Sequence, residues 1–126
     1  MSDVTFPGAI NGVISCRSQP MNGVKVRVGP LPETQIGAIL QLSWQGYSDR
    51  NGQTPIPGTS TSLNHLLTQD DIDKGLDKTI GDWLEHIKPI KVGSARASYT
   101  INGAGGKTAL IDVILLNTSN ESCDEA

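Results

Sequence analysis

Several segments of this chain alternate apolar with polar residues, and a period of two is the repeat of an extended strand with one buried face. In residues 38–45, Leu40, Leu42 and Trp44 fall on one side and polar residues on the other. Glycines, prolines and Asn-Gly pairs, which favour turns, separate such segments. The strands predicted in this way cover residues 11–16, 24–28, 38–45, 60–67, 94–102 and 107–116.

The length and composition agree with one small β domain. A chain of 126 residues has room for a single hydrophobic core. Isoleucine, valine and threonine number 12, 7 and 10 against 7 alanines, which favours strands over helices. Six or seven short strands separated by turn signals predict an antiparallel β-sandwich.

Two sheets packed face to face need large side chains between them. The predicted core residues are Leu40, Leu42, Trp44, Tyr99 and Ile101. We expect an N-terminal arm over residues 1–10, the sandwich over 11–117 and a flexible acidic tail over 118–126.

The segment after residue 67 is less regular. Thr68 precedes acidic residues and Gly75 closes the stretch, which predicts one short helical turn near 68–75. In residues 76–87 the apolar residues recur at helical spacing, whereas the neighbouring strands and an internal glycine favour extended structure. Both conformations remain open for that segment.

Charge and hydropathy exclude several classes of protein. Lys plus Arg number 10 and Asp plus Glu 13, for a net charge of −3, and the basic residues are scattered, so we expect no nucleic-acid binding. No run of 18 apolar residues predicts a membrane span. The first residues lack the basic and apolar regions of a signal peptide, so we expect a cytoplasmic protein or one exported by a leaderless route.

The two cysteines, Cys16 and Cys123, allow two interpretations. They form no CxxC pair and match no zinc-site spacing. A long-range disulfide between the first and last strands is geometrically possible. We favour two unpaired thiols, because no leader directs the chain to an oxidising compartment. The pairing remains open.

Four segments, taken in order, resemble a known family. Residues 37–46 are similar to its glycine-to-tryptophan strand, residues 68–72 to its threonine turn, residues 87–101 to its strand ending in Tyr-Thr-Val, and residues 108–116 to its closing strand. Over residues 11–117 the chain resembles the pseudomonad-type immunoglobulin-like repeat domains of bacterial surface and secreted proteins. The resemblance implies an all-β, immunoglobulin-like antiparallel β-sandwich of about seven strands, used for adhesion, spacing or partner display and without a catalytic site.

The polar clusters of the sequence do not match the motifs of a calcium loop, a phosphate loop or a catalytic nucleophile. The acidic residues in 70–77 lack the glycine and the closing glutamate of a calcium loop. Ile101 stands where the first glycine of a phosphate loop is required before Lys107. Neither His65 nor His86 belongs to a nucleophile signature. We therefore predict no enzyme activity, no catalytic residues, no metal and no cofactor.

The longest polar loop, residues 46–59, supplies the binding candidates. Polar and aromatic side chains on a loop held by rigid strands can recognise protein or sugar. The predicted binding residues are Tyr47, Asp49, Arg50, Asn51 and Gln53.

The sequence thus predicts a non-enzymatic binding, adhesion or structural module that presents loops or a sheet edge to a protein or glycan partner, or to another copy of itself. The alternative is a small secreted effector or toxin component, or a virion or secretion-apparatus part, built on the same fold.

Overall fold

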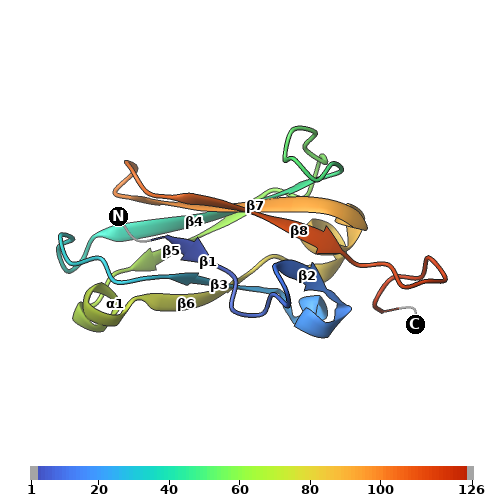
Figure 1. Ribbon diagram of the computed structural model, residues 1–126. Helices are drawn as coiled ribbons and strands as arrows, with labels where there is room; N and C mark the ends of the chain where they lie inside the picture. Colours follow the sequence, from blue (N-terminus) through green and yellow to red (C-terminus); the bar gives the residue numbers. More distant parts are fainter. Residues whose placement is uncertain (1–2, 125–126) are drawn as a thin grey trace.

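A computed structural model describes residues 3–124 and confirms the predicted β-sandwich, in which two sheets pack face to face (Figure 1). The described strands are β1 (Val4–Thr5), β2 (Val13–Ser15), β3 (Val24–Val28), β4 (Ile39–Tyr47), β5 (Thr61–Leu66), β6 (Leu76–Ile80), β7 (Val92–Ile101) and β8 (Thr108–Ile114). The described helical elements are α1 (Gln69–Lys74), the 3-10 turns η1 (Cys16–Ser18), η2 (Pro20–Asn22) and η4 (Lys88–Ile90), and the π-helical turn η3 (Trp83–Ile87).

The strand order is that of an immunoglobulin-like sandwich. One sheet has the order β1-β3-β6 and the other the order β2-β8-β7-β4-β5. The first, third and sixth strands therefore lie in one layer, and the second, fourth, fifth, seventh and eighth strands lie in the other. One pairing departs from the purely antiparallel prediction, because β2 runs parallel to β8. The chain changes sheets between β1 and β2, so these two strands pair with different layers.

The inner faces of both sheets form one core. Four of the five predicted core residues are at most 2% exposed: Leu40, Leu42, Trp44 and Tyr99. The indole Nε1 of Trp44 donates to the His86 carbonyl oxygen at 3.1 Å, so the polar group of this buried ring is satisfied. Ile101 is only half-buried and packs against the edge of the core, because it lies at the end of β7.

The predicted helical turn near 68–75 is confirmed as α1. The Thr68 hydroxyl accepts from the Asp71 N–H at 3.3 Å, and the Asp71 carboxylate accepts from the Thr68 N–H at 3.0 Å. These reciprocal bonds form a capping box, which fixes where the helix begins. Gly75 ends it at φ 84°, a conformation that residues with a side chain rarely adopt.

Residues 76–87 adopt both of the predicted conformations in succession. β6 pairs antiparallel with β3, which buries Leu76 and Ile80. The π-helical turn η3 follows Asp82, whose carboxylate accepts from the Glu85 N–H at 3.2 Å. The helical spacing of the apolar residues therefore spans a strand and a separate turn, both of which point apolar side chains inward.

The N-terminal segment is part of the sandwich rather than a separate arm. β1 pairs antiparallel with β3, and Val4 lies opposite Val28. Val4 is 6% exposed, so its burial in the core holds the described part of this segment in place.

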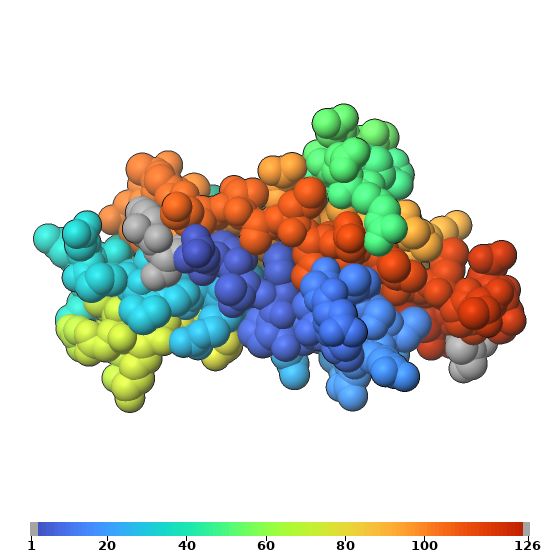
Figure 2. Space-filling model, viewed as in Figure 1, coloured from blue at the N-terminus to red at the C-terminus, as the bar shows by residue number. Residues whose placement is uncertain are grey.

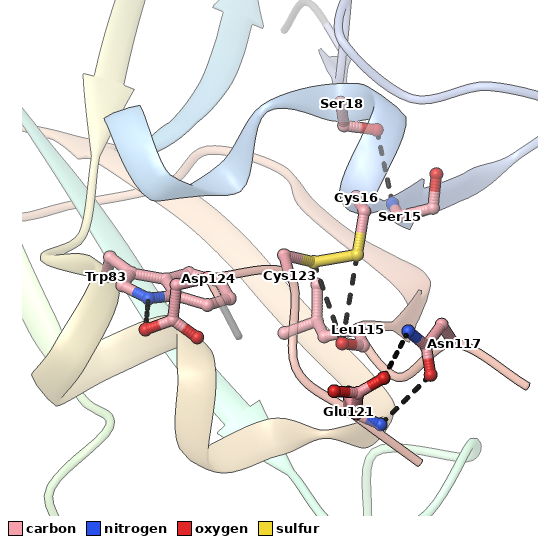
Figure 3. The surroundings of a disulfide bond; sticks show 9 residues. All are labelled: Ser15, Cys16, Ser18, Trp83, Leu115, Asn117, Glu121, Cys123 and Asp124. Atoms are coloured by element: carbon pink, nitrogen blue, oxygen red, sulfur yellow. Dashed lines mark hydrogen bonds between the residues drawn. A yellow bond between two sulfur atoms is a disulfide. The ribbon is translucent and has the colours of Figure 1, made fainter. Parts of the chain in front are cut away.

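A disulfide between Cys16 and Cys123 attaches the C-terminal segment, so the favoured prediction of unpaired thiols is wrong (Figure 3). The side-chain oxygen of Asn117 accepts from the Glu121 N–H at 3.0 Å, which forms a turn that reverses the chain. This turn brings Cys123 back to the end of β8, where the two sulfurs lie 3.8 and 3.6 Å from the Leu115 carbonyl oxygen.

Asp124 adds polar contacts to this attachment. Its Oδ2 accepts from the Trp83 indole N–H and from the Lys88 ammonium, each at 3.0 Å. The Trp83 hydrogen bond, followed by that of Lys88, lowers the pKa of Asp124. Over residues 118–124 the chain is therefore held against the sandwich, in contrast to the flexible tail expected from its composition.

Candidate functional site

The predicted binding loop lies at one end of the sandwich, between β4 and β5. Figure 2 shows it, in green, projecting from the rest of the surface. Tyr47 is the last residue of β4, and the other four predicted binding residues follow within the loop. The fold thus places all five at the same end of the molecule.

Asp49 organises the backbone of this loop. Its carboxylate accepts from the N–H groups of Thr54 at 2.9 Å, Gln53 at 3.0 Å and Asn51 at 3.3 Å. The bond from Thr54 is the largest cause that lowers the pKa of Asp49 below its ordinary value of 3.8. The Ser94 hydroxyl donates to the Asp49 carbonyl oxygen at 2.6 Å and ties the loop to β7.

Two more of the predicted residues interact with the outer face of the five-stranded sheet. The Arg96 guanidinium carbon lies 5.7 Å from the centre of the Tyr47 ring, within the range of a cation–π contact. Arg50 Nη2 lies 3.2 Å from Asp112 Oδ2. Much of the predicted binding chemistry is therefore used to hold the loop in place. Asn51 and Gln53 contribute backbone N–H groups to this arrangement, and their exposed side chains are left for contact with a partner.

A hollow at the opposite end of the sandwich was not predicted from the sequence. The β3–β4 loop and the β7–β8 hairpin border an open recess of about 450 Å³ there. Ala38 is buried and Ile101 half-buried, and the other lining residues are small, polar or acidic. The lining consists of Glu33, Thr34, Gln35, Ala38, Ile101, Asn102, Ala104 and Gly105.

Hydrogen bonds fix both walls of this hollow. The Asn102 N–H donates to the Ile39 carbonyl oxygen at 2.8 Å, and the Asn102 side-chain oxygen accepts from the Ile39 N–H at 2.9 Å. The hairpin is thereby joined to the start of β4. On the other side, the Leu31 N–H donates to the Ile72 carbonyl oxygen at 2.9 Å, which anchors the β3–β4 loop on α1.

The hollow escaped sequence reasoning because its walls come from two loops far apart along the chain. The Gly-Pro pair at 29–30 and the Asn-Gly pair at 102–103 mark both loops as turns. No local pattern indicates that these turns meet at one end of the sandwich, and Glu33 is the one charged residue among the described residues that line the hollow.

The histidines and acids considered as chemistry candidates are held by local partners. His65 Nε2 lies 2.7 Å from Asp71 Oδ2. Partial burial raises the pKa of Asp71, but hydrogen bonds from the Thr68 N–H and from His65 outweigh it and lower that pKa overall. The ring Nδ1 of His86 accepts from the Asp82 N–H at 2.8 Å.

Within residues 3–124, no group of three or more His, Cys, Asp or Glu side chains is placed to hold a metal ion. None of the helices in that range is long and apolar enough to cross a membrane.

No protein-family model and no curated protein matches this chain. Because a fold alone does not define a function, the functional argument rests on the geometry of the surface.

Proposed function

We propose that the protein is a non-enzymatic binding module that holds a partner at the hollow between the β3–β4 loop and the β7–β8 hairpin. The observation that carries this proposal is a recess of about 450 Å³ between two loops with hydrogen-bonded walls. Its volume lies within the roughly 300–1,000 Å³ range of binding pockets. Loops fixed at the end of a rigid scaffold are a common place for recognition.

The lining favours a protein over a glycan, the two partner classes expected from the sequence. Ala38 and Ile101 offer a small apolar surface, while Gln35 and Asn102 offer amide groups at its border. A partner's apolar side chain and its neighbouring backbone would suit this combination. Among residues 3–124, those that line the hollow include no aromatic ring against which a sugar could stack.

Affinity capture from the native source with a matched pair of variants tests this proposal. Ala104→Arg introduces a long side chain at the exposed border of the hollow, and Gln53→Arg introduces the same side chain in the loop at the opposite end. We expect a partner captured by the wild type to be lost with Ala104→Arg and retained with Gln53→Arg. Loss of the partner with Gln53→Arg and its retention with Ala104→Arg would place the site in the loop predicted from the sequence. Retention of the partner by both variants would contradict both locations.

The disulfide bears on the location of the protein. Two locations were expected, the cytoplasm and export by a leaderless route. Cytosolic thiols are kept reduced, so a Cys16–Cys123 bond supports export.

The alternative function, an effector, toxin component, or virion or secretion-apparatus part, makes a separate prediction. Purified effector or toxin would damage target cells, whereas a passive binding module leaves them unharmed.

A further inference from the structure

We infer that the free edge of β5 pairs with β5 of a second copy, so that two five-stranded sheets join into one antiparallel sheet across a two-fold axis. This adds a self-association site to the proposed binding function. It does not depend on the hollow, which lies in loops outside β5.

The other sheet edges formed by the described strands carry recognised protection against pairing. β1 has two residues and β2 has three, and short edge strands offer little to a partner. β6 carries Asp77 and Lys78, and Asp77 lies 3.1 Å from Arg27 of the neighbouring strand. Charged side chains on an edge oppose the addition of a further strand.

β5 has none of these protective features. Its sequence, Thr-Ser-Leu-Asn-His-Leu, contains no Asp, Glu, Lys, Arg, proline or glycine. All six residues keep an unbroken register with β4, from Thr61 opposite Trp44 to Leu66 opposite Ile39. Its one ionisable residue, His65, is held by Asp71 of α1. A regular, uncharged strand with an open edge is the kind that pairs with another chain.

The backbone of β5 has hydrogen-bonding groups directed toward this edge. The Leu67 N–H donates to the Ala38 carbonyl oxygen at 2.9 Å, and the Leu67 carbonyl oxygen accepts from the Gly37 N–H at 3.0 Å, so Leu67 faces β4. Because the direction alternates along a strand, the N–H and C=O groups of alternate residues point away from β4. These residues are Ser62, Asn64 and Leu66.

Because β5 carries no Asp, Glu, Lys or Arg, two copies of it pair without like charges facing each other, and the flanking charges favour the antiparallel orientation. Each chain carries a net charge of −3, so two copies approach best where no acid faces another acid. Asp70 and Asp73 of α1 follow β5 in the chain. In an antiparallel pair the segment after β5 of one copy leaves on the side of the segment before β5 of the other, residues 54–60, which carry no charge, whereas a parallel pair would bring the two acidic segments to the same side.

The same arrangement sets the register. With the two-fold axis at Asn64, Ser62 lies opposite the partner's Leu66, and the three outward-facing residues of each copy exchange about six backbone hydrogen bonds. Leu66, which is 62% exposed in the single chain, becomes partly covered. Because the remaining edges are protected, the pairing closes at a dimer and does not continue into a filament.

Sedimentation equilibrium of the purified full chain, from about 1 μM to 1 mM, tests the inference, because a small interface of this kind gives weak association. Asn64→Lys places two like charges opposite each other across the axis, and such pairs are destabilising. Gln41→Lys is the matched control, since Gln41 lies directly opposite Asn64 on β4 and the side chain is exposed on the same face. We expect Asn64→Lys to raise the dimer Kd at least tenfold and Gln41→Lys to change it less than threefold.

Amide hydrogen exchange gives a second readout that does not rely on a variant. In the wild type, the N–H groups of Ser62, Asn64 and Leu66 should become protected as the concentration rises through the dimer Kd. A chain that stays monomeric to 1 mM, or a dimer that leaves these amides unprotected or is insensitive to Asn64→Lys, overturns the inference. All of these measurements use the pure protein. A negative result therefore overturns the β5 pairing without bearing on partner binding at the hollow, which the capture experiment tests separately.

Discussion

Removal of the disulfide is the perturbation with the largest expected effect on stability. Cys16 and Cys123 are 107 residues apart in sequence, so their bond closes a loop around nearly the whole domain. In the chain-entropy model, closing a loop of that length stabilises the folded state by about 4.8 kcal/mol, and measured disulfides commonly give roughly 2–4 kcal/mol. We therefore expect reduction, or the double variant Cys16→Ser, Cys123→Ser, to cost about 2–5 kcal/mol.

Guanidinium unfolding followed by tryptophan fluorescence measures this cost. Trp44 lies in the centre of the core, and Trp83 contacts Asp124 beside the disulfide, so the two rings report on the core and on the attached segment. The midpoint should fall equally for the reduced wild type and for the double variant. The melting temperature should fall by roughly 8–19 °C, and the double variant should not respond to reductant.

Two results would refute this reasoning. A loss of less than about 0.5 kcal/mol would mean that the cross-link does not constrain the unfolded chain as the entropy model requires. Free thiols, detected by mass spectrometry in protein folded under oxidising conditions, would mean that Cys16 and Cys123 do not pair. As a control, Trp83→Phe leaves the disulfide intact and removes the indole donor to Asp124, so its response to reductant should match that of the wild type.

Three further predictions concern single contacts. Thr68→Ala removes the hydroxyl that accepts from the Asp71 N–H, and urea unfolding should show a loss of about 1 kcal/mol; an unchanged midpoint would contradict the capping role. Trp44→Phe removes the donor to the His86 carbonyl oxygen in the core, and the same assay should show a loss of about 1–3 kcal/mol, whereas no loss would mean that this bond is dispensable. The pKa of Asp71 is lowered from 3.8, so its ionised form stabilises the fold above that pH and the contribution is lost as the pH falls through the lower, folded pKa. Between about pH 5 and pH 2, the free energy of unfolding should therefore decline more steeply in the wild type than in Asp71→Asn. Equal slopes would contradict a stabilising role for the ionised Asp71.

The features that follow from local pattern could be predicted from the sequence. The alternation in residues 38–45 identified the central strand β4, because a period-two pattern has one structural solution when one face is buried. Thr68 and Gly75 marked the two ends of α1, since capping depends on residues close together in sequence. The division of the strands between the two sheets was not predicted, because it depends on pairings between segments far apart in the chain.

The features that depend on distant segments could not be predicted in the same way. The Cys16–Cys123 pairing depends on a turn at Asn117 that returns the chain to β8, and the sequence alone does not place that turn in space. The helical spacing in residues 76–87 was ambiguous, because pairing with β3 determined where the strand ends. The polar character of the loop at 47–53 indicated binding, but Asp49 and Arg50 proved to be used in part for holding the loop.

The most direct test of the proposed recognition site is hydrogen exchange on the complex with the captured partner. Peptides that cover residues 29–38 and 102–107, which form the walls of the hollow, should gain protection when the partner binds. Peptides that cover residues 47–54, at the other end of the sandwich, should exchange as they do in the free protein. Protection confined to residues 47–54, with the walls of the hollow unchanged, would contradict the account.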